Sequence, residues 1–230
     1  MDRIKSFLLY KIFRAVKDCF ALNLKRTYST AKEIGSIINA HYYEKRLGIE
    51  TSEGRIEKDS WSKNGDGHVY FPTPYGLLEK MAAYLKLDGN DVFVDLGCGK
   101  GRVVIFAAKQ KVKAVIGVEL KKSLADIAKT NLSNLKIHHS PIEILNSDAL
   151  DFDYKNGTVF FMCNPFGYKT LTAVIENIRK SLISNPRKIR IVCPTPVFKD
   201  VLNLQDWLTL ENQIADTQIL VWRNRETRGA

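Results

Sequence analysis

The chain has 230 residues, of which 45% are hydrophobic and 26% charged, and its formal net charge is +10. At roughly 100–200 residues per domain, this length fits one domain with a modest extension, and the composition excludes a disordered chain. The positive charge leaves open an interaction with nucleic acid, an anionic membrane or an acidic protein. Since the sequence has no apolar run of about 18 residues or more, no transmembrane segment is expected.

Cysteines and histidines give no sign of a metal site. The cysteines are far apart and form no CxxC pair, and the histidines lack the spacing of metal ligands. Single scattered cysteines are typical of proteins in a reducing compartment. Because no secretory signal is recognisable, we expect a cytoplasmic protein without a bound metal ion.

Residues 1–69 predict a helical extension followed by a lid-like loop. Residues 3–24 have apolar side chains at helical spacing and basic side chains on the other faces. We interpret this amphipathic helix as packing on the domain or on a partner; a peripheral contact with a membrane surface or an organellar presequence is the alternative. A second helix is expected over 30–47, starting near Ser29 or Thr30 and ending before Gly48. The polar residues 50–68 predict the loop.

From residue 70 the chain alternates short apolar runs with helical patterns. Strands are expected over 91–96, 113–120, 158–166 and 188–196, with a strand or loop over 142–147. Helices are expected over 77–87, 101–110, 122–134, 169–183 and near 197–204, and an antiparallel pair over 207–214 and 218–225. Continuous apolar strands that alternate with helices indicate a parallel sheet covered on both faces. The predicted fold of residues 70–230 is therefore α/β, a doubly wound, seven-stranded, mostly parallel sheet with an antiparallel closing hairpin.

The strongest local signal is a glycine loop, Asp95-Leu96-Gly97-Cys98-Gly99-Lys100-Gly101-Arg102, between the first strand and a helix. Open α/β sheets bind ligands at the carboxyl ends of their strands, and the N-terminus of the helix offers free N–H groups to an anion. A P-loop is excluded because Gly101 stands where Ser or Thr is required. The dinucleotide fingerprint fits poorly because Arg102 stands at the third glycine position.

The remaining pattern, D-x-G-x-G-x-G, resembles motif I of the class I S-adenosylmethionine (SAM)-dependent methyltransferases. The resemblance covers about residues 70–225 and includes the closing hairpin, which distinguishes this class from dinucleotide-binding folds. It implies that S-adenosyl-L-methionine is the cofactor, and that Asp95, Gly97, Gly99 and Gly101 belong to its site.

Two acidic residues at later strand ends extend the resemblance. Glu119 ends the second strand, where the class has an acid that accepts both ribose hydroxyls of SAM, although an acid there also serves NAD. Asp148 matches the residue that accepts the adenine amino group, and the backbone N–H of Ala149 would contact the ring. A helix cap is the alternative role for Asp148. Four more residues are assigned to the cofactor site: Leu120, Asn164 after a later strand, and Tyr70 and Thr73 from a segment that often closes over SAM in this class.

The loop Asn164-Pro165-Phe166-Gly167 follows a fully apolar strand. It resembles the loop of amino-methylating members of the class, in which Asp, Asn or Ser is followed by two prolines and an aromatic residue. In those enzymes the Asn side chain and the Pro carbonyl accept hydrogens from the target nitrogen. Asn164 and Phe166 are therefore the expected catalytic residues, but Phe166 replaces the second proline, and a place in the core is its alternative. Tyr75 and Tyr168 are further candidates on the acceptor side.

The run VYFPT at residues 69–73, the glycine loop and GVEL at 117–120 are similar to small protein-lysine methyltransferases of the type acting on ATP synthase subunit c. They also resemble a group of uncharacterised bacterial methyltransferases. The expected function is methyl transfer to an acceptor such as an amine nitrogen of a protein lysine. The alternatives are a small-molecule acceptor, an RNA acceptor, an NAD-dependent oxidoreductase and a non-catalytic binding module. RNA is disfavoured because no RNA-binding module is recognisable.

Overall fold

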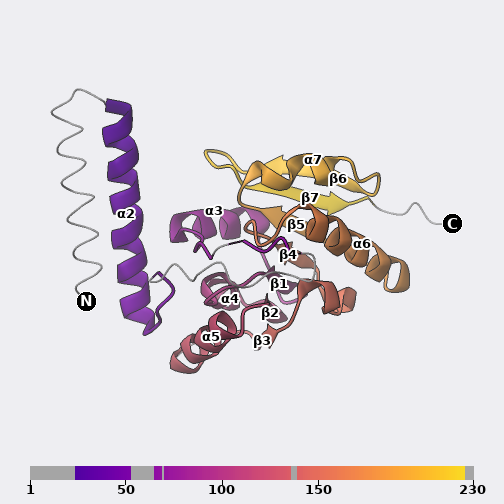
Figure 1. The fold of residues 1–230 in the computed structure, drawn as a ribbon, viewed down its shortest axis with the longest axis horizontal. Coiled ribbons are helices and arrows are strands. Elements are labelled where there is room, and N and C mark those ends of the chain that lie inside the picture. The colour runs from indigo at the N-terminus through magenta and orange to yellow at the C-terminus, as the bar shows by residue number, and fades with distance from the viewer. Residues whose placement is uncertain (1–23, 53–64, 69, 136–138, 226–230) are drawn as a thin grey trace.

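The computed structural model describes residues 24–52, 65–68, 70–135 and 139–225 (Figure 1). Almost all of the helix predicted over 3–24, and most of the loop predicted over 50–68, lie outside these residues. Among the helices that the structure describes, none is long and apolar enough to cross a membrane.

Helix α2 (Leu24–Leu47) forms the described part of the N-terminal extension. Ser29 and Thr30, where the sequence predicted the start of this helix, lie within it. It ends as predicted before Gly48, which has a φ of +71°. This left-handed conformation is typical of the residue that follows a helix, and glycine adopts it without strain.

Seven strands form one sheet in the order β3-β2-β1-β4-β5-β7-β6. Strands β1 to β5 are parallel, whereas β7 is antiparallel to both of its neighbours, β5 and β6. The strand bounds are β1 (Val92–Leu96), β2 (Ala114–Glu119), β3 (Ile142–Asn146), β4 (Val159–Phe161), β5 (Arg190–Cys193), β6 (Leu208–Gln213) and β7 (Leu220–Asn224). The predicted α/β sheet with an antiparallel closing hairpin is confirmed.

Helices cover both faces of the sheet (Figure 1). Alternate side chains of β1 point into two separate cores: Phe93 packs in one, and Val94 and Leu96 pack in the other. The first core contains residues of α3 (Tyr75–Leu85), α4 (Arg102–Ala108) and α5 (Lys122–Asn134). The second contains residues of α6 (Tyr168–Ser184), α7 (Lys199–Asn203) and the short 3₁₀ turns η1 (Ala149–Asp151), η2 (Tyr154–Asn156) and η3 (Pro196–Phe198). This two-sided burial explains why the strands read as continuous apolar runs.

Two strands are shorter than predicted. Strand β4 stops at Phe161, three residues before Asn164, whose φ of +51° is incompatible with an extended chain. Strand β5 stops at Cys193, because Pro194 has no N–H to continue the ladder. The residues after both strands therefore leave the sheet and are available to form a site at its carboxyl edge.

Candidate functional site

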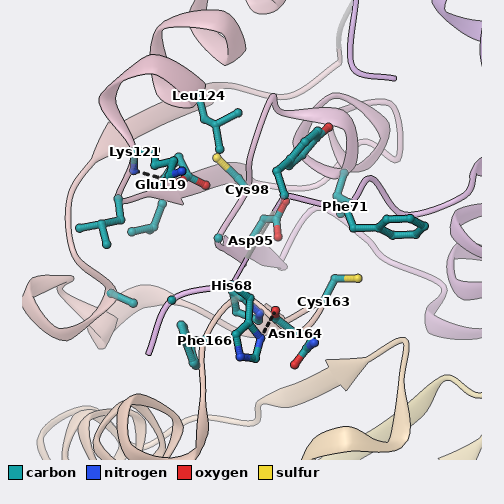
Figure 2. Close-up of a pocket in the computed structure, with 18 of the residues that line it drawn as sticks. His68, Phe71, Asp95, Cys98, Glu119, Lys121, Leu124, Cys163, Asn164 and Phe166 are labelled. Atoms are coloured by element: carbon teal, nitrogen blue, oxygen red, sulfur yellow. Dashed lines mark hydrogen bonds between the residues drawn. The ribbon is translucent and has the colours of Figure 1, made fainter. Parts of the chain in front are cut away.

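A pocket lies over the carboxyl ends of four neighbouring strands, in the order β3, β2, β1 and β4 (Figure 2). An acidic or amide residue that lines the pocket lies near the end of each strand: Asp148, Glu119, Asp95 and Asn164. Figure 2 shows Glu119 at one end of the pocket and Asn164 at the other, with Asp95 between them. The predicted site residues that line the pocket are Tyr70, Thr73, Asp95, Gly97, Glu119, Leu120, Asp148, Ala149, Asn164 and Phe166.

The glycine loop turns back onto β2 as soon as β1 ends. The backbone N–H groups of Gly97 and Cys98 donate to the carbonyl of Val118 at 2.8 and 3.0 Å. Gly97 has a φ of +79°, and a Cβ there would lie 2.3 Å from the Cβ of Pro165. Only glycine therefore allows the loop to approach the segment after β4 this closely.

Gly99 and Gly101 do not line the pocket, although the motif assigns them to the cofactor. A Cβ on Gly99 would lie 2.2 Å from the ring of Tyr70, and a Cβ on Gly101 would lie 3.2 Å from the Cβ of Ala128 in α5. The first glycine makes room for a pocket wall, and the second allows α4 and α5 to pack closely.

Asp95 and Glu119 are two of the buried carboxyl groups that line the pocket. Asp95 is only 2% exposed, and its Oδ2 has no hydrogen-bond partner among the described residues. Burial, together with the nearby charge of Glu119, raises the pKa of Asp95 well above its usual value. Glu119 accepts the backbone N–H groups of Gly99 (2.8 Å) and Lys121 (2.9 Å), one at each oxygen. Burial raises the pKa of Glu119, and these hydrogen bonds oppose the rise.

Asp148 follows β3 and caps the turn η1, accepting the N–H of Leu150 at 2.9 Å. Asp148 therefore has the capping role that was its alternative interpretation, and it also lines the pocket. Ala149 is buried beside it, and its carbonyl accepts the hydroxyl of Tyr154 at 2.7 Å. The turn therefore presents a fixed carboxylate and a fixed backbone to the pocket.

The loop after β4 is held in a strained conformation. Asn164 has a positive φ, and its Oδ1 is buried without a hydrogen-bond partner among the described residues. The Nδ1 of His68 lies 3.1 Å from the carbonyl oxygen of Asn164, and the N–H of His68 donates to the carbonyl of Pro165 at 3.2 Å (Figure 2). Gly67 also pairs with Phe166 in an isolated bridge. Residues 67–68 thus hold the backbone of the loop, and Asn164 still lines the pocket.

Phe166 lies both in the hydrophobic core and at the pocket, the two positions that the sequence left open. It is 5% exposed and stacks on Phe198 in the second core, with ring centroids 6.3 Å apart, yet it also lines the pocket. The two tyrosine candidates do not line the pocket. Tyr75 is buried and stacks on Tyr43 at 4.4 Å, and the exposed Tyr168 donates its hydroxyl to the carbonyl of Val197.

Several residues that line the pocket were not predicted from the sequence: His68, Phe71, Cys98, Arg102, Lys121 and Cys163. The sequence does indicate that Arg102 is unusual, because it stands where a dinucleotide fingerprint has glycine. His68 was interpreted as a loop histidine, and nothing in its spacing indicated that it would reach the loop after β4.

The family model of the histone methylation protein DOT1 matches residues 57–161. A histone-lysine N-methyltransferase specific for H3 lysine 79 from Dictyostelium discoideum is 36% identical over 123 residues, which are 48% of this chain and 7% of that protein. A protein-lysine N-methyltransferase from Saccharolobus islandicus (strain REY15A) is 33% identical over 102 residues, which are 41% of this chain and 60% of that protein. The residues matched by the family model include the glycine loop, part of which lines the pocket.

These matches, together with the sheet order and the glycine loop, support a class I SAM-dependent methyltransferase. A solved RNA methyltransferase from Salinibacter ruber, in complex with S-adenosyl-L-homocysteine, has the same fold, with a TM-score of 0.50 and 21% identity over 66% of this chain and 92% of that one. This methyltransferase chain spans 7% and 60% of the lengths of the two lysine methyltransferases it matches.

The residues of the pocket fit SAM, the cofactor of this class. SAM has an ammonium group, a positively charged sulfonium and two ribose hydroxyls. The orphan Oδ2 of Asp95 and the carboxylate of Glu119 are buried acceptors that such donors and charges would satisfy. A pocket with two buried acids would instead be unfavourable for a purely anionic ligand.

Proposed function

We propose that this protein binds SAM in the described pocket and transfers its methyl group to the amine nitrogen of a protein lysine. The observation that carries the acceptor assignment is that Asn164 lines the pocket, while its Oδ1 is buried without a hydrogen-bond partner among the described residues. A buried acceptor without a partner is costly unless a ligand satisfies it. The names of the two lysine-methylating relatives support the same class of acceptor.

The proposed cofactor contacts follow the order of the strands. Glu119 would accept the ribose hydroxyls, and Asp148 with the N–H of Ala149 would hold the adenine. Asp95 and Gly97 would face the methionine part, since Asp95 lies between Glu119 and the loop after β4. The remaining wall would come from Leu120, Tyr70 and Thr73.

On the acceptor side, the proposed work of the protein is to orient an amine. When bound, SAM supplies a methyl carbon on a sulfonium, which a nitrogen lone pair can take in line as the carbon–sulfur bond breaks. The side-chain carbonyl of Asn164 would accept an N–H of the lysine and so direct the lone pair. Phe166 would limit the width of the channel, because its other face is fixed against Phe198. One proton must leave the nitrogen, since only the neutral amine has a free lone pair.

SAM binding is expected to tighten as the pH rises and to release protons. Burial raises the pKa values of Asp95 and Glu119 in the free protein, whereas a bound cation favours their ionised forms. Affinity should therefore rise with pH until both groups are ionised in the free protein, and then level off. Calorimetry in buffers of different ionisation enthalpy, between about pH 5 and pH 8, measures the protons released. A dissociation constant that is independent of pH, with no proton release, would contradict this assignment.

The acceptor class is tested by transfer of tritium from methyl-labelled SAM to protein, RNA and small-molecule fractions of a lysate. We expect label in protein, recovered as methyl-lysine after hydrolysis and lost when lysine amines are blocked beforehand by acetylation. Glu119→Ala serves as the control that should abolish labelling at low SAM concentrations. Label that enters only RNA or small molecules would refute a protein lysine acceptor while leaving SAM binding intact.

A further inference from the structure

Arg102 lies at a point where three segments far apart in the sequence meet. Arg102 is 4% exposed, and its guanidinium donates to residues of both other segments. The Nε atom donates to the hydroxyl of Thr51 (2.7 Å), and Nη1 donates to the carbonyl of Thr73 (3.1 Å). The Nη2 atom donates to Oε1 of Glu44 (2.8 Å) and to the hydroxyl of Ser52 (2.6 Å). A planar guanidinium is the side chain that can serve this many acceptors at once.

The first of these segments is the end of the N-terminal extension. Glu44 lies in the last turns of α2 and is 7% exposed. Its Oε1 also accepts the N–H of Thr51 (3.2 Å) and the hydroxyls of Thr51 and Ser52. Glu44 therefore fixes the chain after α2, and Arg102 neutralises the buried carboxylate that does so.

The second segment is the pocket wall Tyr70–Thr73, which Arg102 holds at both ends. At one end it binds the carbonyl of Thr73 directly. At the other end the hydroxyl of Tyr70 donates to the carbonyl of Thr51 at 2.7 Å, so that Thr51 connects Tyr70 to Arg102. The ring of Tyr70 in turn lies against Gly99 of the glycine loop. The Cζ atom of Arg102 also lies 4.7 Å from the ring centroid of Tyr75, just after the wall.

We propose that Arg102 is a positioning residue, which holds the Tyr70–Thr73 wall against the cofactor and uses the end of the extension as support. This rests on the proposed function, because it takes SAM to be the ligand of the pocket. It gives the end of the predicted extension (1–69) a part in the cofactor site of the predicted domain (70–230).

A second anchor holds the same chain segment without Arg102. The Nζ of Lys100 lies 2.8 Å from Oε2 of Glu50, and Asn131 exchanges hydrogen bonds with the backbone of Glu50 at 2.9 Å. The Nδ2 of Asn131 also donates to the carbonyl of Lys100 at 3.0 Å. A variant at position 102 should therefore keep residues 49–52 near the glycine loop and still fold.

The test compares SAM dissociation constants of the full chain, measured by calorimetry at a temperature well below the unfolding midpoint of every variant. Arg102→Lys keeps the charge but has a single ammonium, which cannot reach Thr51, Thr73 and Glu44 together. We expect its dissociation constant to rise about tenfold, with the Michaelis constant for SAM rising more than the turnover number falls. Thr51→Val should raise the dissociation constant in the same direction, and Thr51→Ser, which keeps the hydroxyl, should restore it.

Arg190→Lys is the matched control. Arg190 also binds a carboxylate with two hydrogen bonds, to Asp91 at 3.1 and 3.0 Å, but it lies outside the pocket lining. It should lower the unfolding midpoint without changing the SAM dissociation constant. The inference is overturned if wild-type protein binds SAM and Arg102→Lys binds it equally well, or if Arg190→Lys weakens binding as much. Wild-type protein that does not bind SAM would instead overturn the proposed function, and this inference with it.

Discussion

Glu119→Ala is expected to weaken SAM binding by at least about 100-fold, because two hydrogen bonds to a charged acceptor contribute about 1.5–3 kcal/mol each. The substitution removes the proposed acceptor of the ribose hydroxyls. It also releases the N–H groups of Gly99 and Lys121, which the carboxylate holds at 2.8 and 2.9 Å. The loss should therefore have two parts, one from missing ligand contacts and one from a less ordered glycine loop. Calorimetric titration with SAM measures the total.

Two further variants separate these parts. Glu119→Gln keeps an acceptor oxygen but removes the charge, and its affinity should fall between those of wild type and Glu119→Ala. Glu143→Ala removes an exposed glutamate from the neighbouring strand β3 and should bind SAM as tightly as wild type. Wild-type affinity in Glu119→Ala would show that the pocket does not hold the ribose of SAM at β2.

Asn164→Gly is expected to lower the turnover number by about 100-fold, the size of effect seen when one oriented polar group is removed from an active site. The affinity for SAM should change little, since the side chain is proposed to contact the acceptor and not the cofactor. Glycine is the informative substitution because Asn164 has a φ of +51°. It removes the amide without adding strain, whereas alanine in this conformation costs about 1–2 kcal/mol. Steady-state kinetics with a methyl-accepting protein, together with calorimetry, separates the two quantities.

The control for this second prediction is Asn164→Asp, which keeps a side-chain oxygen in the same place. It should retain more turnover than Asn164→Gly, because the oxygen can still accept an N–H from the amine. Equal losses of turnover and of SAM affinity in Asn164→Gly would indicate that the loop after β4 supports the cofactor and does not orient the acceptor.

The order of strands and helices could be predicted because its signals are local. Each central strand is buried on both faces and therefore reads as an apolar run, such as residues 92–94 before Asp95. The glycine loop could be placed at the carboxyl edge for the same reason, since it directly follows that run. Where strands end was harder to predict. The backbone of Asn164 ends the extended segment after β4, and the run TVFFMCNPF does not predict a positive φ at this residue.

The walls of the pocket could not be predicted, because they depend on contacts between distant residues. Arg102 binds Glu44, Thr51 and Thr73, and no periodicity links these positions. The contacts of the glycines in the loop could not be predicted either. The motif indicates that a side chain is excluded at Gly99, but only the fold shows that the excluding group is the ring of Tyr70. Phe166 was ambiguous in the sequence because its ring belongs to the core and to the pocket at once.

The insertion of β7 between β5 and β6 has a consequence for the order in which the chain can fold during synthesis. Along the chain, β7 is the last of the seven strands to leave the ribosome, and within the described sheet β6 pairs with β7 alone. Until residues 220–224 emerge, the nascent protein exposes the open edge of β5, which is a template for pairing with other chains. The pocket is formed by β1 to β4, which are synthesised earlier, so the ligand site can assemble before the sheet is complete.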